Sequence, residues 1–131
     1  MSAGVQLQTA IFQALENISE PVYAMGSVPD NVTDRYVVLG EKTLNEWDTD
    51  GLTGFDVTMT IHTWDTSAAN RSFVALENLQ QSIYDLLHRA TLITNGYNVI
   101  GVEQEMCEPM LDPDGLTRHG VQRFRAKMRA L

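Results

Sequence analysis

The chain has 131 residues, of which 44% are hydrophobic and 20% charged, and this composition fits one globular domain, residues 1–131, with one core. Its net charge of -8 disfavours non-specific binding to nucleic acid, and its longest apolar runs are too short to span a membrane. Cys107 is the only cysteine, so an internal disulfide is excluded and a reducing compartment is expected.

The charge is unevenly distributed along the chain. Residues 1–117 contain four basic and seventeen acidic side chains, whereas residues 118–131 contain five basic and no acidic ones. This contrast suggests that the basic end meets an acidic surface, either its own or that of a neighbour.

The first quarter of the chain predicts a helix, a short strand and a loop. Apolar residues recur at helical spacing over residues 5–18, and Pro21 prevents the helix from continuing. Residues 22–25 are expected to form a short strand. Residues 26–34 contain Pro29, Asp30 and Asn31 and are expected to form a loop.

Two long strands are expected next, joined by a loop at residues 47–54. The segment 36–46 is apolar in its first half and polar in its second, which suits a strand that is buried at one end. In the segment 55–64 apolar side chains alternate with polar ones, so the apolar set should point inward.

A second helix and a closing set of strands complete the prediction. Ser67 is a plausible N-cap for a helix that runs to about Arg89, more than 20 residues or about 30 Å long. Asn95-Gly96 favours a type I′ hairpin turn between strands at 91–94 and 97–108. A turn over residues 109–115, with a positive φ at Gly115, then leads into a final strand. In that strand one face carries Gly120, Gln122, Phe124, Ala126 and Met128, and the other carries His119, Val121, Arg123, Arg125, Lys127 and Arg129.

The last two strands can be aligned from their side chains. If residue numbers across the pair sum to about 228, apolar Ile100 and Val102 and polar Gln104 lie opposite Met128, Ala126 and Phe124. Glu103 then faces Arg125, and Glu105 faces Arg123. A slip by one residue would destroy both matches. The element order therefore predicts an α+β fold, with an antiparallel or mixed β-sheet of about four main strands and two α-helices packed on one face.

No catalytic, cofactor or metal motif is found. Asp48, Asp50 and Asp56 faintly resemble an acidic calcium loop, but the further ligands of that pattern are missing, and a polar hairpin loop is the simpler interpretation. The three histidines are too scattered for a metal motif, and His62 and His88 are expected at the surface. Cys107 has no activating neighbour, since adjacent Glu108 would raise its pKa. We therefore expect no catalytic residue, cofactor or metal.

Several residues are candidates for an interface. Arg123 and Arg125 are accounted for by pairing with Glu103 and Glu105, whereas Lys127 and Arg129 lack partners in the neighbouring strand. Trp47 at the edge of a loop is either a core residue or an interface anchor.

The chain also resembles the tail-completion family of long-tailed bacteriophages, the tail-terminator or neck proteins. The matching segments are Tyr36-Val37-Val38-Leu39-Gly40, Trp47-Asp48-Thr49, the strand ending in His62-Thr63-Trp64, the long helix after it and, most specifically, residues 112–125. In that last segment an Asp-Pro-Asp-Gly turn is followed by Thr-x-His-Gly and Arg-Phe-Arg. The loop at residues 26–34 departs from the family pattern.

The resemblance implies a structural protein of the virion tail or neck, assembled in the host cytoplasm, without catalytic residues. Such proteins form a hexameric ring that caps the head-proximal end of the tail tube, ends tube polymerisation and docks on the head connector. DNA passes through the lumen without specific binding, and no membrane is involved. The implied partners are copies of the chain, the tail tube protein and the head–tail connector protein.

A ring of identical subunits needs two different, complementary patches on each subunit. We hypothesise that Lys127 and Arg129 meet Asp48 and Asp50 of the next subunit. Two alternatives remain open at this point: a small non-enzymatic binding or regulatory module without a virion role, and an enzyme that holds a metal in the Trp47 loop.

Overall fold

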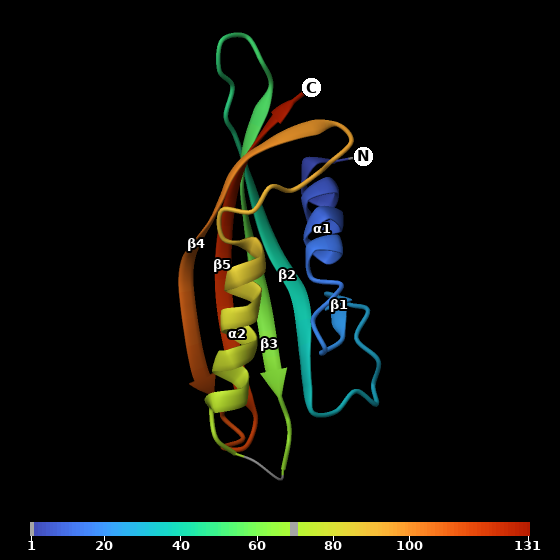
Figure 1. Ribbon diagram of the computed structural model, residues 1–131, viewed down its shortest axis with the longest axis vertical. Coiled ribbons are helices and arrows are strands. Elements are labelled where there is room, and N and C mark those ends of the chain that lie inside the picture. Colours follow the sequence, from blue (N-terminus) through green and yellow to red (C-terminus); the bar gives the residue numbers. More distant parts are fainter. Residues whose placement is uncertain (1, 69–70) are drawn as a thin grey trace.

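The computed structural model describes residues 2–68 and 71–131 and contains a five-stranded mixed sheet with two helices (Figure 1). The strand order is β1-β2-β3-β5-β4, with β1 parallel to β2 and the other pairs antiparallel. The α+β prediction is therefore confirmed, and the strand beyond the four main ones is the short β1. The elements are α1 (Ala3–Ala14), β1 (Val22–Ala24), β2 (Arg35–Glu46), β3 (Gly54–Asp65), α2 (Val74–Leu87), β4 (Tyr97–Leu111) and β5 (Arg118–Ala130).

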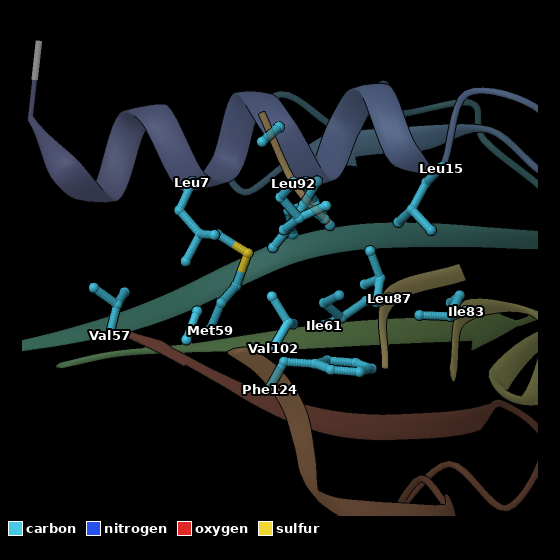
Figure 2. Close-up of a cluster of buried hydrophobic side chains, with 14 of the residues drawn as sticks. Leu7, Leu15, Val57, Met59, Ile61, Ile83, Leu87, Leu92, Val102 and Phe124 are labelled. Carbon is cyan, nitrogen blue, oxygen red and sulfur yellow. The ribbon is translucent and has the colours of Figure 1, made fainter. Parts of the chain in front are cut away.

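Both helices cover the same face of the sheet, as predicted. In Figure 1 α2 lies across β4, β5 and β3, while α1 lies beside β2. One hydrophobic cluster joins the two helices to alternate positions of the central strands, because those positions all point to one side of the sheet. Figure 2 shows this core, which includes Leu7 of α1, Leu15 directly after that helix, Ile83 and Leu87 of α2, and Val57, Met59, Ile61 and Phe124 of the sheet.

The second helix is shorter than predicted and begins later. Ser67 does not cap it: its N–H donates to Asp65 Oδ1 at 2.9 Å, and its carbonyl accepts from Arg118 Nη2 at 2.7 Å. Those bonds hold Ser67 in the segment after β3, and α2 starts at Val74. The 14-residue helix is about 21 Å long at 1.5 Å per residue. Ala69, which falls within the predicted helix, lies outside the described residues.

The type I′ turn forms at a different dipeptide from the one predicted. Asn95 and Gly96 do not have positive φ, and residues 91–94 form only an isolated bridge from Ile93 to Asn98. Gly96 instead donates its N–H to Gln6 Oε1 of α1 at 2.8 Å, which draws this segment onto the helix. Asp50-Gly51 has the expected geometry, with φ of 51° and 76° between Thr49 and Leu52, whose backbones bond to each other.

The register of β4 against β5 follows the prediction only in the middle of the strand. Val102, Glu103 and Gln104 pair with Ala126, Arg125 and Phe124. Bulges on either side shift the pairing by one residue in opposite directions, so Ile100 lies opposite Lys127, not Met128. One bulge is at Gly101, where φ of 71° suits glycine, and the other is at Glu105.

In the described residues, each edge of the sheet is partly covered. On one edge β1 has three residues. On the other edge, the segment after α2 covers β4: Arg89 N–H donates to Val102 O at 2.6 Å, and Gln104 N–H donates to His88 Nδ1 at 3.1 Å. Farther along β4, Pro109 has no N–H to offer.

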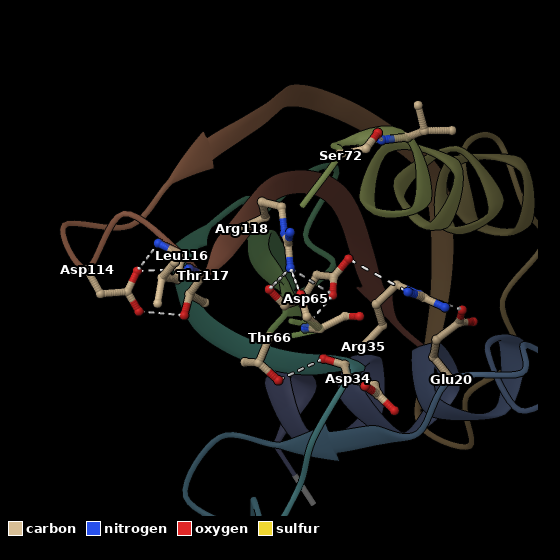
Figure 3. Close-up of polar contacts among 12 residues, drawn as sticks. Glu20, Asp34, Arg35, Asp65, Thr66, Ser72, Asp114, Leu116, Thr117 and Arg118 are labelled. Carbon is tan, nitrogen blue, oxygen red and sulfur yellow. Dashed lines mark hydrogen bonds and ion pairs between the residues drawn. The ribbon is translucent and has the colours of Figure 1, made fainter. Parts of the chain in front are cut away.

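A buried ion pair joins β3 to the start of β5 (Figure 3). Arg118 and Asp65 are 0% and 1% exposed, and Arg118 Nη2 lies 3.3 Å from Asp65 Oδ1. The same nitrogen donates to the carbonyls of Asp65 and Ser67, so the guanidinium fixes the chain as it leaves β3. Arg35 Nη1 lies 3.7 Å from the second carboxylate oxygen of Asp65.

Candidate assembly surface

The face of the sheet opposite the helices is uncovered by any other element of the described chain, and we call it the open face (Figure 1). The β3–β5 register places its side chains in two adjacent rows. The row on β3 is Asp56, Thr58, Thr60, His62 and Trp64, and the row on β5 is His119, Val121, Arg123, Arg125 and Lys127. Inward and outward sets on both strands are as predicted from alternation.

Acidic and basic side chains neutralise one another in the middle of the open face. The Glu105 carboxylate accepts from Arg123 Nε at 3.0 Å and from Arg125 Nε, while Arg125 Nη1 lies 2.9 Å from Asp56 Oδ2. Burial would raise the pKa of Glu105, but hydrogen bonds and charges from Arg125 and Arg123 outweigh it and lower that pKa. Glu103 lies opposite Arg125 in the backbone register, and the guanidinium reaches Glu105 and Asp56 instead.

At one end of the open face, two cations lie over Trp47. Lys127 Nζ is 5.1 Å and Arg129 Cζ 5.5 Å from the centre of the Trp47 ring, within the range of cation–π attraction. Arg129 Nη2 also donates to Thr49 Oγ1 at 2.9 Å. The basic end of β5 therefore meets the Trp47 loop of its own chain.

The two acidic candidates of that loop are exposed. Asp48 Oδ1 accepts from Gly54 N at 3.1 Å and so braces the hairpin, while Asp50 stands in the tight turn at its tip. In Figure 1 this β2–β3 hairpin projects beyond the rest of the sheet, close to the C-terminus. The interface candidates at 47–50 and 127–129 are thus gathered at one end of the molecule.

At the other end of the open face, two histidines are in direct contact. His62 Nδ1 and His119 Nε2 are 2.8 Å apart, and His62 Nε2 lies 3.0 Å from Glu41 Oε1. His119 stacks on Trp64 with ring centroids 3.7 Å apart and planes inclined by 7°. The sequence did not predict this contact: 57 residues separate the two histidines along the chain, and they meet because β3 and β5 are neighbours in the sheet.

The environment of this pair disfavours a charge on His119. Burial lowers the pKa of His119, and the adjacent His62 lowers it further, while Asp112 and Glu41 partly oppose the shift. Burial also raises the pKa of Tyr36, which lies opposite Trp64 on β2. In the described part of the chain, no group of three or more His, Cys, Asp and Glu side chains is arranged to hold a metal ion.

A cleft of about 480 Å³ lies on the helix side of β4, between that strand and α2. Its lining includes Gln80, Tyr84, Cys107 and Pro109. Burial raises the pKa of Cys107, and the charge of Glu77 on α2 raises it further, whereas the sequence had suggested the adjacent Glu108 as the cause. Neither described helix is long and apolar enough to cross a membrane.

Two features of the sequence could have revealed more of this structure. Asp65 and Arg118 are in phase with the inward-pointing side chains of β3 and β5. Alternation alone therefore places two opposite charges on the buried face of the sheet. Likewise His62 and His119 both belong to outward sets, and only the pairing of β3 with β5 was needed to bring them together.

Comparison with known proteins finds a matching family, a curated relative and solved structures of similar fold. The family described as Tail completion protein gp17 matches residues 9–129. The Tail completion protein gp17 of Bacillus phage SPP1 is 22% identical over 90 residues, which are 69% of this chain. That match spans 64% of the relative's length, just under two thirds. A chain from a structure titled "Virion of native gene transfer agent (GTA) particle" has the same fold, with a TM-score of 0.87, 18% identity and 98% of each chain covered.

Proposed function

The chain belongs to the Tail completion protein gp17 family, and on that premise we propose that it caps the head-proximal end of a phage tail tube, ends tube polymerisation and joins the tail to the head connector. The observation that carries this proposal is the family match over residues 9–129, which is nearly the whole chain. The fold shared with a chain of a gene transfer agent virion supports a structural part in a particle.

The proposed role is structural and not enzymatic. Its partners would be the tail tube protein, the head–tail connector protein and further copies of this chain, assembled in the host cytoplasm into the neck of the virion. DNA would pass through the ring without specific binding. The internal neutralisation of Arg123 and Arg125 by Glu105 and Asp56 supports this last point, because it leaves little basic surface for phosphates.

We place the contact between neighbouring subunits at the hairpin end of the molecule. The two cations over Trp47 form a pre-assembled basic and aromatic patch, and the exposed Asp48 and Asp50 lie on the hairpin beside it. Because both sets lie at this end, a head-to-tail ring would require the projecting hairpin of one subunit to reach the basic patch of the next. Because Arg129 is already bonded to Thr49, Lys127 is the cation that we expect to reach the next subunit.

The position of the protein in a particle tests the proposal for its role. In particles assembled without this chain, we expect tail tubes of uncontrolled length that lack heads. In complete particles, we expect electron microscopy to place it between tube and connector. Normal tail length and normal head attachment without the chain would contradict the proposal.

Charge reversal tests the subunit contact. We expect the double substitution Lys127→Glu and Arg129→Glu to weaken ring assembly at low salt about tenfold or more, because each subunit contact would lose two attractions and gain repulsion. Native mass spectrometry measures the ring fraction. The matched control is Arg71→Glu, an exposed base far along the chain from the hairpin end, which should leave assembly unchanged.

A complementary swap separates a direct contact from a folding defect. Adding Asp48→Lys and Asp50→Lys to the double variant should restore rings if the two patches meet. If the quadruple variant stays monomeric while circular dichroism shows a folded chain, the proposed pairing is wrong.

A further inference from the structure

The four side chains that meet at one end of the open face form a chain of polar contacts, which we call the imidazole latch: Glu41, His62, His119 and Asp112. They come from the bulge of β2, from β3, from β5 and from the turn between β4 and β5. Glu41 lies 3.0 Å from His62, the two imidazoles are 2.8 Å apart, and His119 Nδ1 lies 3.7 Å from Asp112 Oδ1. The latch therefore connects the turn between β4 and β5 to the bulge of β2, across the neighbouring strands β5 and β3.

The geometry dictates where the protons are. The Glu41 carboxylate only accepts, so the facing His62 Nε2 carries a hydrogen. When His62 is neutral its Nδ1 is then an acceptor, and His119 Nε2 donates to it. In the neutral state this leaves His119 Nδ1 without a hydrogen, and its 3.7 Å separation from Asp112 Oδ1 is too long for a hydrogen bond.

Added protons have different effects on the latch. The first can bind His119 Nδ1, where it faces Asp112, and the bond between the imidazoles survives. A second proton must go to His62 Nδ1, and then both facing nitrogens carry hydrogens and two positive rings are in contact. That state cannot keep the 2.8 Å separation. We propose that the imidazole latch is a pH-sensitive contact, closed while either imidazole is neutral and opened in acid once both carry a proton on their facing nitrogens.

Other charges on the same face do not replace these partners. Glu108 of β4 lies opposite Val121, and Arg123 of β5 lies opposite Thr60, so one acid and one base flank the latch on its inner side. Tyr36 of β2 has a raised pKa and stays uncharged in this range. Asp65 and Arg118 point to the helix side, where they bind each other.

The direction of the pH effect follows from the lowered pKa of His119. The unfolded chain takes up a proton near the ordinary value of 6.5, and the folded chain does so only at lower pH. The stabilising contribution of neutral His119 is therefore complete above that value. It is lost as the pH falls from there through the pKa of the folded state.

Trp64 provides an optical readout, because it stacks on His119 and the chain has only one other tryptophan. In a Trp47→Phe background, opening of the latch should expose the Trp64 ring to a soluble quencher. We expect the acrylamide quenching constant to rise about twofold between about pH 7.5 and about pH 5, with unchanged far-ultraviolet circular dichroism.

Two histidine substitutions in the same background make the result specific. His119→Asn should make the quenching constant independent of pH, whatever its absolute value. His88→Asn is the matched control, since His88 also stacks on an aromatic ring, Tyr84, but lies against α2. It should keep the full pH response.

Proton nuclear magnetic resonance gives a second, independent check. The His119 titration midpoint should lie below 6.5, should rise in His62→Asn and should fall further in Asp112→Asn, as the charges of those neighbours require. A quenching constant that does not change with pH, or a response that survives His119→Asn, would overturn the proposal.

Discussion

Arg118→Met is expected to lower the free energy of unfolding by about 3–5 kcal/mol, because it leaves the carboxylate of Asp65 buried without its main counter-charge. Both side chains are essentially unexposed, so water cannot replace the lost partner. The substitution also removes the donor that the Asp65 and Ser67 carbonyls share. Urea unfolding followed by circular dichroism measures the loss.

The size of this effect should depend on burial and not on arginine as such. Arg123→Met removes a half-exposed guanidinium from the same strand and should cost only a small fraction of the loss at Arg118. Asp65→Asn added to Arg118→Met should recover part of the stability, because it removes the stranded charge. Equal losses of unfolding free energy for Arg118→Met and Arg123→Met would show that burial of the Arg118–Asp65 pair does not increase its effect on stability.

Gly120→Ala is expected to destabilise the fold by about 1–3 kcal/mol through overpacking. A Cβ at this position would overlap with Thr63 Oγ1 and Gln80 Nε2, closer than real atoms approach. Thr63 and Gln80 are both buried, one in β3 and one in α2, so neither can move away without disturbing the packing of the helix on the sheet. Thermal unfolding measures the loss.

Two comparisons test the mechanism at Gly120. Gly4→Ala is the control: its Cβ would make ordinary contacts of 3.5 Å or more with Leu44 and Lys42 of β2, and alanine favours helix, so stability should be unchanged or slightly raised. Thr63→Ala should cost less in the Gly120→Ala background than alone, because it vacates the space that the new methyl group needs. Additive losses would mean that the two positions do not compete for space.

Local patterns predicted much of this fold. Alternation assigned the two faces of β3 and β5 correctly, since a strand with one buried face leaves little choice of side chain. The register at Glu103 also followed from matching charges and apolar groups across the pair. Alternation and cross-strand matching both depend only on the residues of one strand or one strand pair. They can therefore be read from the sequence without knowing how the rest of the chain folds.

The local predictions that the structure contradicts are those that depend on contacts between segments distant in sequence. Ser67 looked like an N-cap, but Asp65 and Arg118 use its backbone, and Arg118 is 51 residues away. Gly96 looked like a hairpin glycine, but Gln6 holds it, 90 residues away. From the sequence, Lys127 and Arg129 were expected to lack partners in the neighbouring strand. Nothing in the sequence showed that both cations would lie over the Trp47 ring.

The way that the sheet ends has a consequence for the protein at high concentration. An exposed strand edge is a template on which another chain can add backbone hydrogen bonds, and fibres grow by that route. Here the amide of Gln104 and the carbonyl of Val102 are already occupied by His88 and Arg89, and Pro109 interrupts the rest of the strand. These contacts shorten the free edge of β4, so we expect copies of this chain to add to one another less readily by strand pairing along that edge.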